Sequence, residues 1–472
     1  MVEKNILVWF RNDLRIEDNE ILLEACEKAT NIIPVYVFDP RYYETTTYNT
    51  LKTGHFRAKF ILESVANLKK SLQNLGGDLL ILQGKPEEII PEIAKKYNAD
   101  AVYHHREVAS EETEVSTLVE DALWKLKINL KHFIGHTFYH KEDLPFPIKD
   151  IPDVFTAFRK KVERESTVRP CFKAPTHIIV PSNLEPSALP SLINLGFTAC
   201  ADEVTTANFN GGESEGLKRL KYYLWDTDLL KKYKLTRNSL LGMDYSSKLS
   251  PWLAAGCLSP RSIYWEIKKY ERERGANDST YWLIFELLWR DYFRFMFKKH
   301  GTKYFLEEGF KNKTQVLAEN QSELFEAWKN GQTGIPFIDA NMLELNQTGF
   351  MSNRGRQNVA SFLIKDLKVN WVLGAAYFEE KLIDYSPSSN WGNWAYIAGV
   401  GNDPREDRYF NIIKQATDYD PKAEFVKHWL PQLKNIPHSK IQALDKLTTA
   451  ELASYGVELG NNYPNALVVL PV

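Results

Sequence analysis

The period of the hydrophobic pattern changes once along the chain, and this change constrains the fold more than any other feature. In the first part, short apolar runs at 6–10, 32–38, 79–82 and 101–103 alternate with amphipathic stretches. Apolar residues recur at helical spacing from Phe56 to Leu75 and stop at Gly76-Gly77, which is typical of a helix end. This alternation predicts a parallel sheet covered by helices on both faces.

The pattern of the second part predicts helices alone. From about 145 to 213 the periodicity fades and Pro, Ser, Thr and Asn accumulate, which predicts a long, structureless connection that packs against another domain. Beyond 215 apolar residues recur at helical spacing. We therefore expect an α/β domain with a Rossmann-like parallel sheet at 1–140, a wrapping linker at 141–213, an all-α domain at 214–440 and a short, nearly featureless tail at 441–472.

Composition excludes several classes of protein. The four cysteines are scattered without a CxxC pair, which argues against disulfides, zinc and iron–sulfur clusters and favours a reducing cytosol. We expect no signal peptide, and no apolar run reaches the roughly 18 residues of a membrane span. No GxGxxG follows the first predicted strand, so a dinucleotide on that turn is not expected. The net charge of −2 gives no overall attraction to nucleic acid, so such a contact needs a local patch.

The segment 379–396 concentrates the residue types that a planar ligand needs. It contains Asp384, Asn390 and Trp394, and an Arg pair, Arg354 and Arg356, lies just upstream. Aromatic rings can stack on a flat heterocycle, an Arg–Asp pair can fix its polar edge, and an Asn can touch one ring atom without adding charge. Together they predict a flavin site with an indole beside it.

Two further motifs each allow two interpretations. Residues 244–251 place hydroxyls and a Lys directly before a helix, which suits a phosphate, but Ser250 could simply cap that helix with Pro251 at its first position. Glu286 and Trp289 share a helix face and could meet a planar ligand. The alternative is a surface pair of Glu286 with Arg290 over a core Trp.

An Arg-rich helix start and a group of histidines complete the candidates. Asn353, Arg356 and Gln357 fall on one helix face, while Arg354 points elsewhere and could reach a phosphate. Gly355 is a poor helix former without a close approach, which favours a functional role over a merely solvated face. The metal-like spacings His104-His105 and His136…His140 have no matching carboxylate cluster, so we expect no metal site.

Several long motifs in the right order resemble one family over essentially the whole chain. They are WFRNDLR at 9–15, FNGGE at 209–213, TRNSLLG at 236–242, MSNRGRQ at 351–357, RYFNIIKQ at 408–415 and WLPQL at 429–433. The chain resembles the photolyase/cryptochrome family, and more closely its DASH-type cryptochrome branch.

The resemblance implies FAD held in a U shape inside the helical domain. Arg356 and Asp384 would pair along the isoalloxazine, and Asn390 would face N5. Trp394 would lie nearest the flavin and Trp371 next, passing electrons inward during photoreduction. The family's third Trp position is Ala318 here, which leaves Tyr304, Trp391 or another Tyr as the exit. The implied cofactor-binding residues are Tyr233, Ser246, Ser247, Lys248, Leu249, Ser250, Glu286, Arg290, Arg356, Asp384, Ser386 and Asn390.

The implied reaction is light-driven cleavage of cyclobutane pyrimidine dimers by an electron from reduced flavin. Tyr396 stands where enzymes for duplex DNA usually carry a second Trp, and Gln357 where they usually have Met. Stacking contributes about 1–3 kcal/mol per base, so a more polar platform favours single-stranded or looped DNA, with RNA left open. The implied catalytic residues are Glu286, Trp289, Asn390, Trp394, Trp371, Tyr396 and Gln357. The implied DNA contacts are Arg237, Trp289, Asn353 and Arg354.

The branch also commonly binds a folate antenna, 5,10-methenyltetrahydrofolate, between the domains, with Glu107 as the candidate partner of its pterin. We expect a monomer. The rival function is a blue-light receptor or nucleic-acid-binding regulator. Repair of the (6-4) lesion would need a His near the lesion, and none occurs between Ser352 and Trp394. A flavin oxidoreductase is least supported, because nothing resembles a nicotinamide site.

Overall fold

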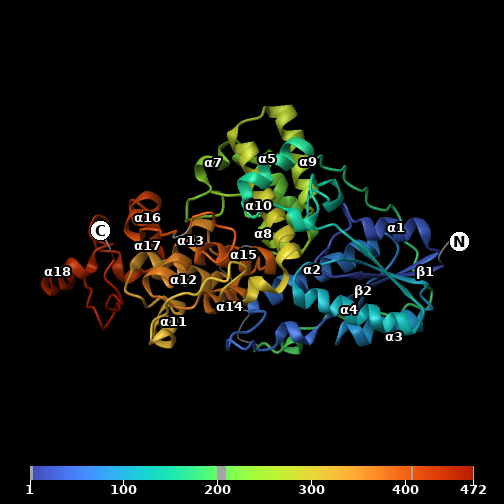
Figure 1. Cartoon of the computed structure of the whole chain (residues 1–472), viewed down its shortest axis with the longest axis horizontal. Helices are drawn as coiled ribbons and strands as arrows, with labels where there is room; N and C mark the ends of the chain where they lie inside the picture. Colours follow the sequence, from blue (N-terminus) through green and yellow to red (C-terminus); the bar gives the residue numbers. More distant parts are fainter. Residues whose placement is uncertain (1–3, 199–208, 406–407, 471–472) are drawn as a thin grey trace.

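The N-terminal domain is a five-stranded parallel sheet with helices on both faces (Figure 1). The structure, a computed structural model, describes residues 4–198, 209–405 and 408–470. The strands lie in the order β3-β2-β1-β4-β5, and every pair is parallel. The elements are β1 (Asn5–Phe10), α1 (Glu20–Lys28), β2 (Asn31–Phe38), α2 (His55–Asn74), β3 (Leu80–Gln83), α3 (Pro86–Lys96), β4 (Ala101–His105), α4 (Ser110–Lys125) and β5 (Asn129–Phe133).

Both faces of this sheet are buried, as the near-continuous apolar strands predict. Along β1, Ile6 and Val8 belong to one hydrophobic cluster, whereas Leu7 and Trp9 belong to the other. The predicted parallel sheet is confirmed. Strand β5 was not predicted, because the polar residues Asn129, Lys131 and His132 interrupt its apolar pattern; it pairs on one side only, with β4.

The connection between the domains contains a helix that the sequence pattern did not predict. Helix α5 (Phe155–Glu165) buries Phe155, Phe158 and Val162. The expectation of a structureless linker at 145–213 was therefore wrong over these three turns. Three apolar residues among charged ones gave too weak a signal, and packing on α10 provides the rest. Part of the predicted linker, 199–208, lies outside the described residues.

The remainder is helical, as predicted, and every sheet strand of the described residues lies before 134. Helix α10 runs through the middle of the molecule between the sheet domain and the C-terminal helices (Figure 1). After α5, the α-helices are α6 (Glu213–Lys221), α7 (Tyr233–Thr236), α8 (Ser250–Ala254), α9 (Pro260–Arg274), α10 (Asp278–His300), α11 (Gln321–Lys329), α12 (Pro336–Thr348), α13 (Asn353–Ser361), α14 (Trp371–Lys381), α15 (Pro387–Ala398), α16 (Ile412–Tyr419), α17 (Glu424–Trp429) and α18 (Thr449–Ser454).

The C-terminal segment has more structure than its sequence suggested. Helix α18 begins with a capping box between Thr448 and Glu451, and Tyr463 is buried with its hydroxyl donating to Asp339 at 2.7 Å. The expectation of a nearly featureless tail was therefore wrong. In the described part of the chain, no helix combines the length and the apolar character that crossing a membrane requires.

Candidate functional site

The helical domain encloses a cavity of about 410 Å³ that adjoins a smaller one of about 90 Å³. The two share lining residues, among them Arg356, Gln357 and Asp384. Of the residues expected to act, those lining the larger cavity are Tyr233, Arg237, Ser246, Ser247, Lys248, Leu249, Ser250, Glu286, Trp289, Arg290, Asn353, Arg356, Gln357, Asp384 and Tyr396. Ser386, Asn390 and Trp394 line the smaller one. Residues far apart in sequence are thus brought together as expected.

Asp384 is the polar centre of the cavity. Its Oδ2 accepts hydrogen bonds from Ser250 Oγ at 2.6 Å and from Arg356 Nη2 at 2.9 Å. Its Oδ1 is buried and has no partner among the described residues. The alternative interpretation, in which Ser250 caps its helix, is therefore wrong. The Ser250 side chain binds Asp384 instead. The free oxygen can accept from a ring N–H, which suits a flavin edge.

Glu286 pairs with Arg237 and not with Arg290. Arg290 instead donates to two backbone carbonyls, those of His136 and Leu253. The alternative of a Glu286–Arg290 surface pair is therefore wrong. Burial raises the pKa of Glu286, while the nearby Arg237 charge opposes the rise.

Trp289 lines the cavity and packs against several aromatic rings. One face of the indole is covered by Phe155 of α5, whose ring lies 3.7 Å away at 14°. Tyr396 meets Trp289 edge to face, with ring centroids 5.9 Å apart. Arg408 donates to the Tyr396 hydroxyl at 2.9 Å and is itself paired with Asp403. Arg408 also lines the cavity. Apart from its place in the motif at 408–415, no pattern in the sequence predicted this role of Arg408.

The packing at the start of α13 explains why a glycine, Gly355, stands there. A Cβ on Gly355 would lie 2.1 Å from Asn341 Oδ1, so the close approach inferred from the sequence is present. Asn353 is exposed at the cavity, whereas Arg354 lies outside its lining, over the ring of Tyr419 at 4.6 Å. The Arg354 guanidinium makes two long hydrogen bonds, of 3.4 and 3.5 Å. Its role toward DNA stays a prediction.

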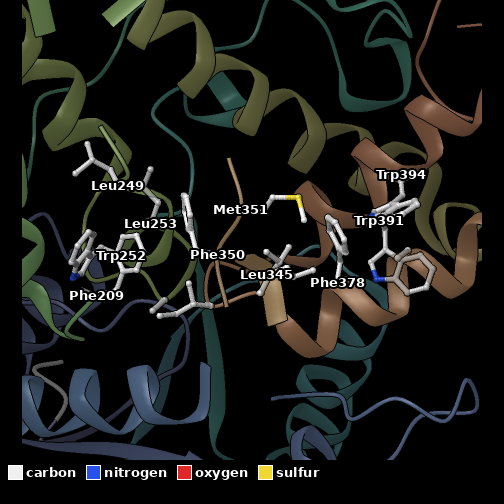
Figure 2. Packing of buried hydrophobic residues seen from close by; sticks show 14 of the residues in the cluster. Phe209, Leu249, Trp252, Leu253, Leu345, Phe350, Met351, Phe378, Trp391 and Trp394 are labelled. Carbon is white, nitrogen blue, oxygen red and sulfur yellow. The ribbon is translucent and has the colours of Figure 1, made fainter. Parts of the chain in front are cut away.

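Two tryptophans of α15, Trp391 and Trp394, pack in the hydrophobic core, and the second borders the smaller cavity (Figure 2). Trp394 lines that cavity and packs on the backbone of Gly374, where a Cβ would lie 2.3 Å from its ring. Trp371, one turn before Gly374 on α14, is buried and contacts Trp391 with centroids 5.8 Å apart. Of the named exit candidates, Trp391 therefore touches Trp371, whereas Tyr304 stacks on Phe297 at 4.3 Å.

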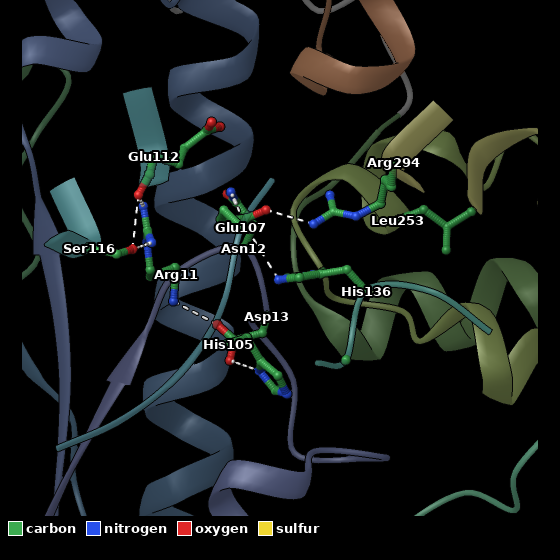
Figure 3. Close-up of polar contacts among 12 residues, drawn as sticks. Arg11, Asn12, Asp13, His105, Glu107, Glu112, Ser116, His136, Leu253 and Arg294 are labelled. Atoms are coloured by element: carbon green, nitrogen blue, oxygen red, sulfur yellow. Dashed lines mark hydrogen bonds and ion pairs between the residues drawn. The ribbon is translucent and has the colours of Figure 1, made fainter. Parts of the chain in front are cut away.

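A third cavity, of about 140 Å³, lies between the two domains and contains Glu107 (Figure 3). Glu107 accepts from Asn12 at 3.0 Å and from Arg294 at 2.8 Å. Burial raises its pKa, but the charges of His136 and Arg294 outweigh this and leave the pKa well below its ordinary value. Glu112, also in the lining, has a pKa raised to about 7 by burial and by the charge of Glu107.

Two of the candidate histidines, His105 and His136, each have one carboxylate partner. His105 Nδ1 lies 2.6 Å from Asp13 and His136 Nε2 lies 3.3 Å from Glu107. His104 pairs with His132 at 2.7 Å. No group of three or more potential metal ligands occurs in the described ranges.

The described residues fit FAD. A second buried polar atom, in addition to Asp384 Oδ1, has no partner in the described chain. It is the hydroxyl of Tyr245, which also lines the larger cavity. The loop from Ser246 to Leu249 adds backbone N–H groups that make no hydrogen bond to another described residue. Ring-edge and phosphate partners are therefore both present in the lining of one cavity.

Comparisons with known proteins agree. A family model described as "FAD binding domain of DNA photolyase" matches residues 282–471, and one described as "DNA photolyase" matches residues 6–177. The chain is 50% identical to "Cryptochrome DASH" of Gloeobacter violaceus, over 100% of this chain and 94% of that protein.

Two solved structures extend the likeness. The cryptochrome of Synechocystis sp. PCC6803 superposes with a TM-score of 0.95 at 50% identity, covering 99% of this chain and 97% of that one. A bacterial class III photolyase from Agrobacterium tumefaciens superposes with a TM-score of 0.87 at 27% identity, covering 99% and 95%. The predicted fold class and FAD-binding domain are therefore confirmed. The chain belongs to the photolyase/cryptochrome family, in its DASH branch.

Proposed function

We propose that the protein repairs cyclobutane pyrimidine dimers in single-stranded or looped DNA, with light and reduced FAD. One observation carries the proposal. Glu286, Trp289, Gln357 and Tyr396 surround one cavity, and this cavity adjoins the smaller one lined by Asn390. A base-stacking surface and hydrogen-bonding groups thus lie directly beside the flavin space.

Each residue has a distinct task. FAD, when bound and reduced, supplies the electron that light releases. Asp384 Oδ1 would accept a hydrogen bond from the flavin edge, and the neutral Asn390 amide would add no charge there, which would tolerate a reduced, anionic ring. Glu286 lines the cavity, and its carboxyl is held there by Arg237, where it can hydrogen-bond the polar edge of a pyrimidine. Trp289, which lines the cavity, would stack on one base.

The single-strand preference follows from a weak platform. Phe155 covers one face of Trp289, and Arg408 holds the hydroxyl of Tyr396. Extracting a lesion from a duplex costs a few kcal/mol, and each stacked base returns about 1–3 kcal/mol. Gln357 makes the pocket more polar and so weakens stacking further. The stacking energy therefore suffices to bind an already unpaired dimer but not to offset the cost of extracting one from a duplex.

The cavity between the domains supports a folate antenna, 5,10-methenyltetrahydrofolate. Glu107 would accept from the amino and ring N–H groups of the pterin. Its lowered pKa keeps it ionised for that role. Arg290 and Tyr385 line both this cavity and one of the flavin cavities, so the two sites share a wall. We also propose a monomer in the cytosol, the latter supported by dispersed cysteines of which Cys26, Cys171 and Cys257 are free thiols.

The test is repair of a dimer-containing oligonucleotide by photoreduced protein under blue light, with single-stranded, looped and duplex substrates in parallel. We expect repair of the first two only. The matched variant Glu286→Gln keeps the size of the side chain and should lower repair without loss of FAD. Equal repair of duplex would refute the weak-platform argument and keep the enzyme. No repair of any substrate, with FAD bound and reduced, would favour the light-sensing regulator.

A further inference from the structure

The side chain of Arg219 lies behind the loop 243–249, away from the flavin cavity. Arg219 is in the last turn of α6, and its side chain is only 11% exposed. It lines a separate surface hollow, together with Met243 and Asp244, whereas Ser246 and Ser247 line the flavin cavity. The loop therefore separates Arg219 from the flavin space.

Every hydrogen bond of the guanidinium goes to this loop. Nε donates to the carbonyl of Ser247 at 3.0 Å. Nη2 donates to the carbonyls of Met243 at 2.8 Å and Ser246 at 3.0 Å. Nη1 donates to Asp244 Oδ1 at 3.2 Å. A planar fork with fixed donor directions can hold three carbonyls at once, which a lysine ammonium on a flexible stem does not.

The loop has little other support. Among the described residues, no backbone N–H of 243–249 donates a hydrogen bond to the protein. Lys248 adopts a left-handed φ of 52°, which side chains disfavour, and Leu249 follows in the right-handed helical region. Successive residues of opposite hand turn their N–H groups to one side and form an anion-binding concavity.

The carbonyl bonds to Arg219 decide where the N–H groups point. In a trans peptide the C=O of one residue and the N–H of the next point in opposite directions, and the described chain contains no cis peptide. The carbonyls of Ser246 and Ser247 face Arg219. The N–H groups of Ser247 and Lys248 therefore face away from it, toward the flavin cavity that both residues line.

We propose that Arg219 is a positioning residue for FAD: it holds the peptide planes of this loop so that the Ser247 and Lys248 N–H groups meet the diphosphate. The proposal deepens the assignment of FAD binding and does not depend on dimer repair. Arg219 acts through geometry and not through direct attraction of the phosphates, because it faces the rear of the loop and is paired with Asp244.

The test separates geometry from charge. The variant Arg219→Lys keeps the charge and loses the fork. Lys218→Gln is the control, since Lys218 is exposed and, among the described residues, is paired only with Glu215. Apoprotein is titrated with FAD and with riboflavin, which lacks the diphosphate. In R219K we expect the Kd for FAD to rise about 10- to 100-fold, as two N–H···phosphate bonds are misaligned. The Kd for riboflavin should stay at the value of the unchanged protein, and K218Q should leave both constants unchanged.

Three outcomes would overturn the proposal. An unchanged Kd for FAD in R219K would leave at most a role for the charge. An equal loss for FAD and riboflavin would indicate general damage to the fold. If R219K is isolated only with FAD bound, its rate of FAD release is measured instead, and a rate equal to that of the unchanged protein would refute the idea. A protein that binds FAD but repairs no dimer would sink the repair proposal and leave this one standing.

Discussion

Replacing Gly374 with alanine places a methyl group where the indole of Trp394 lies. The added Cβ would be 2.3 Å from Trp394 Cη2 and 2.6 Å from Leu363 Cδ2, whereas carbon atoms in contact lie about 3.5–4.0 Å apart. Leu363 and Phe378 are fully buried and leave little room on their sides. The indole can retreat only toward the cavity of about 90 Å³ that it already lines.

The magnitude follows from this confinement. Forcing an extra methyl into a packed core costs about 1–3 kcal/mol. In the apoprotein the empty cavity absorbs part of this strain, and alanine in a helix returns up to about 1 kcal/mol. When the isoalloxazine fills the cavity, the strain returns in full. The Kd for FAD reflects only the part of the strain that the apoprotein escapes, so we expect G374A to fold and its Kd to rise by at most about 150-fold, the equivalent of the upper bound of about 3 kcal/mol.

The assay is titration of apoprotein with FAD and with riboflavin. Binding of the two ligands should weaken by the same factor, because both carry the isoalloxazine. The variant Trp394→Phe provides the second arm of a double-mutant cycle. A smaller ring leaves room for the methyl group, so G374A should cost much less affinity in the W394F background. An unchanged Kd in folded G374A, or equal costs of G374A in both backgrounds, would refute the reasoning.

Three further predictions follow from the same contacts. Trp391→Phe should slow flavin photoreduction by thiol under blue light as severely as Trp371→Phe, because Trp391 touches Trp371 and the third family position is alanine; a rate equal to that of the unchanged protein contradicts this exit. Asp384→Asn leaves Arg356 without its charge partner and should raise the Kd for FAD about 10-fold or more, measured by titration. The pKa of Glu112 is raised by burial to about 7 from 4.5, so the folded state loses stability as pH rises through that window. The urea midpoint of the unchanged protein should therefore fall between pH 5 and pH 8, and the midpoint of Glu112→Gln should fall by less. If the two midpoints decrease in parallel with pH, Glu112 does not cause the loss of stability.

Local patterns predicted the fold where each element carries its own period. The strands β1 and β2 and the end of α2 at Gly76 follow from apolar runs and a glycine. Helix α5 was missed because its burial depends on α10, more than a hundred residues away in sequence. The flavin motif at 379–396 was evident from residue types alone. The residue types alone did not show which carboxylate pairs with which cation.

The pairing errors show why. Glu286 had a cation four residues away, at Arg290, yet it pairs with Arg237, 49 residues distant. Spacing on one helix predicts which partners are possible, but tertiary packing decides among them, since Arg290 is drawn to two carbonyls of other segments. The same limit hid Arg219, which donates to backbone carbonyls, and Arg408, which donates to the hydroxyl of Tyr396 on α15.

The stack of Phe155 on Trp289 has a consequence for how this protein can be divided. A fragment cut at the start of the FAD-binding helices would lack α5, and the indole of Trp289 would lose the ring stacked on it. Trp289 lines the larger cavity, so that fragment would carry an altered cavity wall. Recombining the sheet domain of one relative with the helices of another therefore requires that α5 be kept with the helices.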